Sequence, residues 1–127
     1  MDSKKFEKFF SALSSPLRLQ MVLLMAKRPF CVCELENVFD VTQPAISQNL
    51  RILKDANLII EKRAKQWIFY STNKEILNSL LEEFLILLEK ESTFIEIAGL
   101  KISELPNDPQ RSCEILENRK KEILKNN

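Results

Sequence analysis

The sequence contains no histidine and only one glycine among its 127 residues, and its net charge is only +1. Without histidine the chain lacks the residue that proteins use most often as a general base and as a metal ligand. It also lacks a glycine-rich phosphate-binding loop and paired carboxylates at a recognisable cleft spacing, which argues against an enzyme. The small net charge means that no global field draws the protein to nucleic acid or to an anionic membrane.

Long apolar runs are missing too, since none approaches the ~18 residues of a membrane-spanning helix. The opening MDSKKFEKFF has no apolar core of a secretory signal, so we expect a cytoplasmic protein without a membrane partner. Hydrophobic residues make up 45% and charged residues 29%, which is typical of a globular chain. The scarcity of strand-like runs predicts a mainly α fold, with one domain over residues 1–92 and a C-terminal extension over 93–127 that could be helical.

Residues 42–57, TQPAISQNLRILKDAN, are predicted to form a helix with one apolar and one polar face. Ile46, Leu50 and Leu53 recur at the spacing of a buried stripe. The opposite side carries short amides, hydroxyls and an arginine, the side chains that read base edges in a DNA major groove. A polar face that only meets solvent is the alternative. The candidate DNA-contacting residues of this helix are Thr42, Gln43, Pro44, Ser47, Gln48 and Arg51.

A shorter helix is expected just before, over about residues 32–39, with Leu35, Val38 and Phe39 buried. Asp40 follows in the tight turn, where it can take the left-handed conformation in place of glycine. A short helix, a tight turn and a longer helix form the helix-turn-helix pattern.

Residues 58–63 and 67–71 are rich in β-branched and aromatic side chains and predict a β-hairpin. Its tip carries Arg63 and Lys65, so it resembles a wing that grips DNA phosphates, although a solvated tip is an equal alternative. Residues 42–67 contain five basic and two acidic side chains, which gives this part of the chain a local positive charge.

Helices are also predicted over about residues 3–13, 16–26 and 74–91. The last of these has apolar residues on a face too wide for one contact surface. We expect the surplus, together with the first helix, to be buried against a second copy in a homodimer.

Several motifs in this order, SSPLRLQMVLLM, CVCEL, TQPAISQNLRILKDANLI and a hairpin ending in YS, resemble the ArsR/SmtB family of small winged-helix repressors. The resemblance covers about residues 6–88. It implies a dimeric winged helix-turn-helix protein of about five or six helices and one β-hairpin wing. It also implies binding to double-stranded operator DNA as two half-sites ~34 Å apart, and release when an inducer binds.

Cys31 and Cys33 match the CVCDL segment of the family's arsenite-responsive members, whose thiolates coordinate As(III) or Sb(III). Soft thiolates suit such a thiophilic ion. Glu36 stands where those members carry a third cysteine, so a third sulfur would have to come from Cys113. Zinc is less expected, because the family's other metal site uses Asp and His and this chain has no histidine.

Side chains at positions i and i+2 of a helix point about 200° apart, so Cys31 and Cys33 cannot bind one ion inside an intact helix. Either the helix begins after them or binding unwinds its first turn, and that distortion would misplace the recognition helix. Three alternatives stay open. The two cysteines could be small buried hydrophobes, or they could form a redox switch with each other or with Cys113. The fold could also serve as a protein-interaction module.

Overall fold

The computed structural model describes residues 4–89 and 108–125. The chain divides into two compact units, Asp2–Glu89 and Lys90–Asn127. The domain boundary expected after residue 92 lies outside the described residues. None of the described helices is long and apolar enough to cross a membrane.

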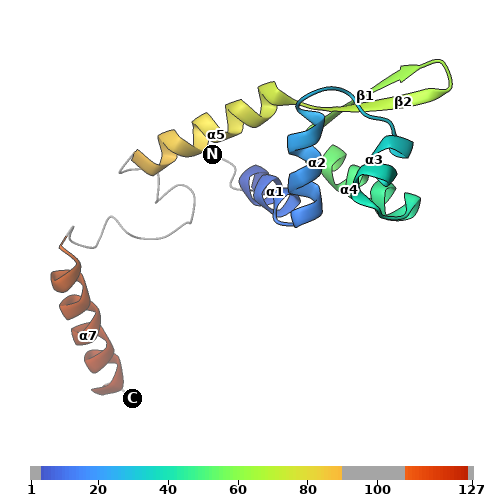
Figure 1. The fold of residues 1–127 in the computed structure, drawn as a ribbon. Coiled ribbons are helices and arrows are strands. Elements are labelled where there is room, and N and C mark those ends of the chain that lie inside the picture. The colour runs from blue at the N-terminus through green and yellow to red at the C-terminus, as the bar shows by residue number, and fades with distance from the viewer. Residues whose placement is uncertain (1–3, 90–107, 126–127) are drawn as a thin grey trace. The chain divides into compact units, whose positions relative to one another are not determined.

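Helices dominate the described part of the chain, with one two-stranded antiparallel sheet (Figure 1). The mainly α class predicted from the sequence is therefore confirmed. The elements of the first unit are α1 (Lys4–Leu13), α2 (Pro16–Met25), α3 (Val32–Phe39), α4 (Gln43–Asp55), β1 (Ile59–Ala64), β2 (Trp67–Thr72) and α5 (Lys74–Glu89). The second unit contains α7 (Pro109–Lys125), a helix within the C-terminal extension.

Local sequence signals set the ends of the helices. The hydroxyl of Ser15 accepts a hydrogen bond at the start of α2, and that of Thr42 accepts one from the Ala45 amide at the start of α4. Asp40 (φ 52°) adopts the left-handed conformation after α3, as predicted, and Asn57 (φ 59°) adopts it after α4.

The core lies between α1, α2, α3, α4 and the start of β1. Its largest fully buried side chains are Phe9, Met21, Met25, Leu35, Ile46, Leu53 and Leu58. One expectation was wrong: Val38 is 55% exposed although we expected it to be buried. Leu23 of α2 is also exposed, at 60%. Both side chains line an open apolar groove between α2 and α3, because no other described element covers these helices on that side.

The hairpin pairs Ile59 with Thr72 at one end and Ala64 with Trp67 at the other. Its turn is therefore only two residues long, one fewer than expected from the sequence. Lys65 takes a positive φ of 59° in this turn, a conformation that usually favours glycine.

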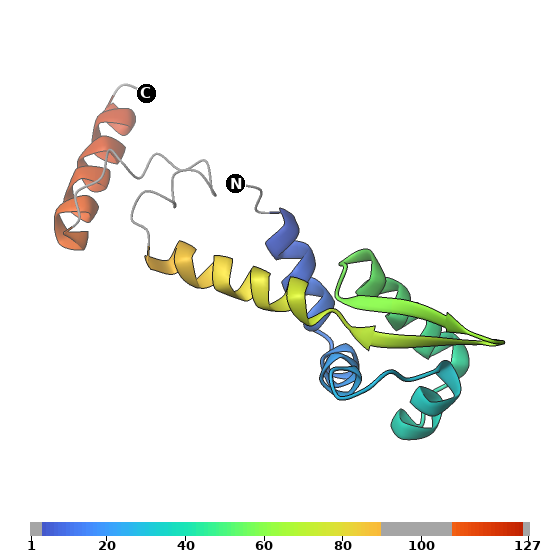
Figure 2. The ribbon, with the colours of Figure 1, turned by 90° about the horizontal axis from the view of Figure 1, so that it is seen from above.

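Helix α5 contacts α1 and then extends away from the rest of the unit (Figures 1 and 2). The ring of Phe84 lies 6.1 Å from that of Phe6 and 5.0 Å from that of Phe10, and Lys5 pairs with Glu83 at 2.8 Å. Much of the remaining apolar surface of α5 meets no other described residue. Its exposed large apolar side chains are Ile76, Leu81, Leu85, Ile86 and Leu88.

Candidate DNA-binding face and thiol site

Helix α4 buries its apolar stripe of Ile46, Leu50 and Leu53 and turns its polar side outward. We call this polar side the recognition face. It consists of Thr42, Gln43, Pro44, Ser47, Gln48 and Arg51, all exposed except the half-buried Ser47. The six residues that the sequence singled out thus lie on one accessible surface of one helix.

Two side chains of the recognition face already bind each other. The side-chain nitrogen Nε2 of Gln43 donates to the hydroxyl of Ser47, one helical turn further on, at 2.7 Å. This bond holds both side chains along the helix, and either of them must exchange it for a new partner before it can reach a base edge.

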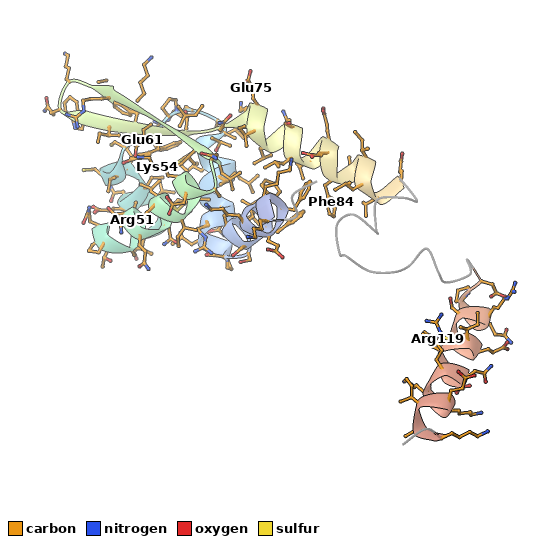
Figure 3. All side chains as sticks on the ribbon, turned by 180° about the vertical axis from the view of Figure 1, so that it is seen from behind. Arg51, Lys54, Glu61, Glu75, Phe84 and Arg119 are labelled. Atoms are coloured by element: carbon orange, nitrogen blue, oxygen red, sulfur yellow. The ribbon has the colours of Figure 1, made fainter. Side chains whose placement is uncertain are left out.

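The hairpin lies beside the C-terminal half of α4 and is linked to it by an ion pair. Lys54 of α4 and Glu61 of β1 lie 3.1 Å apart, with Arg51 further back along the helix (Figure 3). An exposed pair of this kind adds little stability but favours one orientation of the hairpin. Arg63 and Lys65 are exposed at the end of the hairpin, as expected for a wing.

Arg18 holds α1, α2 and α4 together, a role that the sequence did not reveal. Its Nε donates to the carbonyl of Ala12 at 2.7 Å, and its Nη1 donates to Oδ1 of Asn49 at 3.0 Å. Asn49 in turn donates to the carbonyl of Ala45 within α4 at 2.7 Å. A single arginine inside the apolar stretch LRLQMVLLM was the one signal for it.

The two cysteines lie on either side of the start of α3. Cys31 is the extended N-cap residue (φ −91°, ψ 168°), whereas Cys33 lies in the first turn. Both thiols are free, with Cys31 half-buried and Cys33 exposed. The exposure of Cys33 argues against the alternative in which both cysteines are core hydrophobes.

Cys113 lies exposed on α7, in the second unit. Among residues 4–89 and 108–125, no three His, Cys, Asp or Glu side chains form a group that could hold a metal ion. A third thiolate from Cys113 therefore stays a prediction.

Glu34 ties the start of α3 to the segment before it. Its Oε1 accepts a hydrogen bond from the amide of Cys31 at 3.1 Å, and its Oε2 lies 2.6 Å from Nη2 of Arg28. The Arg28 guanidinium also lies 3.8 Å from the centre of the Phe30 ring. Arg28, followed by the Cys31 amide, lowers the pKa of Glu34 to about 2. We call this arrangement the Arg28–Glu34 clamp.

Comparison with known proteins places this architecture in a family. The family model "Bacterial regulatory protein, arsR family" matches residues 15–61, which include α3 and α4. The arsenical resistance operon repressor of Bacillus subtilis is 41% identical over 81 residues, covering 63% of this chain and 77% of the relative. The chain belongs to the ArsR family of bacterial regulators.

A second relative and a solved structure agree with this assignment. The arsenic resistance transcriptional regulator ArsR1 of Pseudomonas putida is 28% identical over 102 residues, covering 80% of each chain. The structure of HlyU from Vibrio cholerae matches with a TM-score of 0.57 and 25% identity, covering 67% of this chain and 92% of that one. The protein is thus a DNA-binding transcriptional repressor with a winged helix-turn-helix fold, and the named relatives are transcriptional regulators rather than enzymes.

Proposed function

We propose that this ArsR-family repressor is a cytoplasmic homodimer that binds double-stranded operator DNA and releases it when As(III) or Sb(III) binds the thiolates of Cys31 and Cys33. The recognition face enters the major groove, and Arg63 and Lys65 contact the phosphate backbone. In this proposal the protein belongs to the arsenite-responsive branch of its family.

The position of the two thiols at the start of α3 carries the proposal. An extended N-cap and an exposed first-turn residue put both sulfurs at the start of the same helix, two positions apart in the sequence. Paired thiolates suit a soft ion far better than Mg²⁺ or Ca²⁺. The names of the Bacillus subtilis and Pseudomonas putida relatives, both linked to arsenic resistance, support the same inducer. A third sulfur from Cys113 completes the site in this proposal.

Dimer formation is supported by one uncovered side of α5, where Leu81, Leu85 and Leu88 recur at helical spacing and are exposed. Burial of such a surface is favourable by about 25 cal/mol per Å² of apolar area. Because α1 already packs against α5 through Phe6, Phe10 and Phe84, the two helices present one continuous surface to a second copy.

Release follows from the short path between the thiols and the recognition face. Cys31 is the extended N-cap residue and Cys33 lies inside the first turn, and in this proposal the binding of one ion by both sulfurs rearranges that turn. Helix α3 leads through Asp40 directly into α4, so the rearrangement reaches Thr42 and Gln43. An ion that binds the rearranged state more tightly than the DNA-competent state shifts the equilibrium toward release.

The test is fluorescence anisotropy of a labelled operator pool with the reduced protein, titrated separately with arsenite, zinc and peroxide. The proposal expects release by arsenite, lost in Cys31→Ser and in Cys33→Ser, with DNA binding retained in both variants. Cys113→Ser tests the third sulfur, because it weakens the arsenite response only if that thiolate is a ligand. Release by peroxide alone favours a redox switch, and a protein that binds no DNA favours an interaction module.

A further inference from the structure

The residue before Cys31 belongs to the wing as well as to the thiol segment. The amide of Phe30 donates to the carbonyl of Tyr70 at 2.9 Å, and the amide of Tyr70 donates to the carbonyl of Phe30 at 2.8 Å. Phe30 is only 6% exposed, so these two bonds are sheltered. Through them, Phe30 forms an isolated antiparallel bridge with Tyr70 of strand β2.

One peptide group therefore joins the wing to α3. The carbonyl of Phe30 and the amide of Cys31 belong to the same peptide bond, which is planar and rigid. Its oxygen accepts from the Tyr70 amide, and its N–H donates to the carboxylate of Glu34. If a change in the backbone φ of Cys31 redirects its side chain toward Cys33, this peptide turns with respect to α3 and at least one of the two bonds is strained.

The Arg28–Glu34 clamp fixes the orientation of this peptide. The carboxylate of Glu34 accepts the hydrogen bond from the N–H of this peptide. Arg28 forms an ion pair with the same carboxylate and lies over the ring of Phe30. Because a hydrogen bond from a backbone amide to a carboxylate is stronger than a neutral one, the partly buried bond from the Cys31 amide to Glu34 favours the arrangement in which α3 begins at Val32 and Phe30 stays paired with β2. The Arg28–Glu34 ion pair is exposed, so it adds little stability and mainly orients the carboxylate.

We infer that Glu34 is a positioning residue that sets the concentration of thiophilic ion needed for release, and that ion binding acts on the wing through the peptide between Phe30 and Cys31. This inference rests on the proposed function. It adds a second route to the one through α4, since a rotation of this peptide moves β2 and with it the hairpin that carries Arg63 and Lys65. It also assigns a role to a carboxylate that is not itself an ion ligand.

The chain carries its own probe for the wing. Trp67 is its only tryptophan, lies at the start of β2 and is 45% exposed. We expect arsenite to change the Trp67 emission of the reduced protein without DNA, with the same midpoint as operator release. Cys31→Ser should abolish the change.

Glu34→Gln tests the clamp. The variant should bind the operator within about twofold of the wild type but release it at an arsenite concentration about three- to tenfold lower, because a charge-assisted bond that opposes the rearrangement is weakened. Glu36→Gln is the matched control. It makes the same change in the same helix, and the Glu36 side chain has no partner among the described residues. It should leave the arsenite midpoint unchanged.

The outcomes separate the inference from the proposed function. The inference is overturned if arsenite releases the operator but does not change the Trp67 emission. It is also overturned if Glu34→Gln and Glu36→Gln have the same arsenite midpoint. Either result leaves the proposed function standing. If Glu34 only stabilises the fold, Glu34→Gln lowers the melting temperature and the operator affinity together without moving the arsenite midpoint, which also overturns it. If arsenite does not release the operator from the wild-type protein, both the inference and the proposed function are overturned.

Discussion

Arg18 should be the most consequential polar residue of the fold, and replacing it with methionine tests this directly. The change keeps a long unbranched stem but removes three hydrogen bonds made by the guanidinium. The bond to the Ser11 carbonyl is long and exposed, at 3.4 Å, so water can replace it. The bonds to Ala12 and Asn49 are partly buried. Such bonds to a charged donor contribute about 1.5–3 kcal/mol each, so with partial burial we expect a loss of about 2–4 kcal/mol in the free energy of unfolding.

Urea denaturation followed by circular dichroism measures this loss. A double-mutant cycle with Asn49→Ala should give a coupling of about 1–2 kcal/mol, because each variant removes the same bond. Arg51→Met makes the same exchange at an exposed position of α4 and should change stability by no more than about 0.5 kcal/mol. A loss below about 1 kcal/mol in Arg18→Met, or no coupling to Asn49, would refute the role that we assign to Arg18.

Three further predictions concern DNA contact, dimerisation and the dependence of stability on pH. In anisotropy titrations, Arg51→Ala should weaken operator binding by about 1–3 kcal/mol, and Lys65→Ala should reduce the slope of log affinity against log salt by about 1. Unchanged operator binding in both variants would contradict the proposal that the recognition face and the tip of the hairpin contact DNA. Leu85→Glu should yield monomers in sedimentation experiments, because it places a charge in the apolar surface of α5; an intact dimer would exclude this interface. Because Arg28 holds the pKa of Glu34 at about 2, the contribution of the ion pair to stability is complete above the ordinary carboxyl value of 4.5 and is lost as the pH falls toward 2. The stability difference between the wild type and Glu34→Gln should therefore be constant at neutral pH and shrink in acid, and a difference that grows in acid would contradict this assignment.

Features that depend on neighbouring residues were predictable from the sequence. The buried stripe of α4 follows from its apolar spacing, and the left-handed conformations of Asp40 and Asn57 follow from their places after apolar helices. The expectation for Val38 failed because periodicity identifies an apolar face but not the element that covers it.

Contacts between distant segments were not predictable. Arg18 and Asn49 are 31 positions apart, and Phe30 pairs with a strand that follows it only after three further elements, α3, α4 and β1. Nothing in the local sequence of either partner indicates such a contact, because tertiary packing decides which segments meet. The spacing of Cys31 and Cys33 did indicate that one intact helix cannot hold both sulfurs on one ion, and α3 begins between them. The start of a helix is set by neighbouring residues. A contact between Cys113 and the two cysteines at the start of α3 depends on tertiary packing, so the sequence cannot predict it.

Operator release by arsenite is the most direct test of the central proposal. Reduced protein bound to a fluorescent operator should lose its anisotropy signal when arsenite is added, and Cys31→Ser and Cys33→Ser should keep the DNA bound at the same arsenite concentration. If either serine variant still releases DNA like the wild type, that thiol is not part of the sensor. If arsenite leaves the wild-type complex intact, the thiols at the start of α3 do not sense this ion.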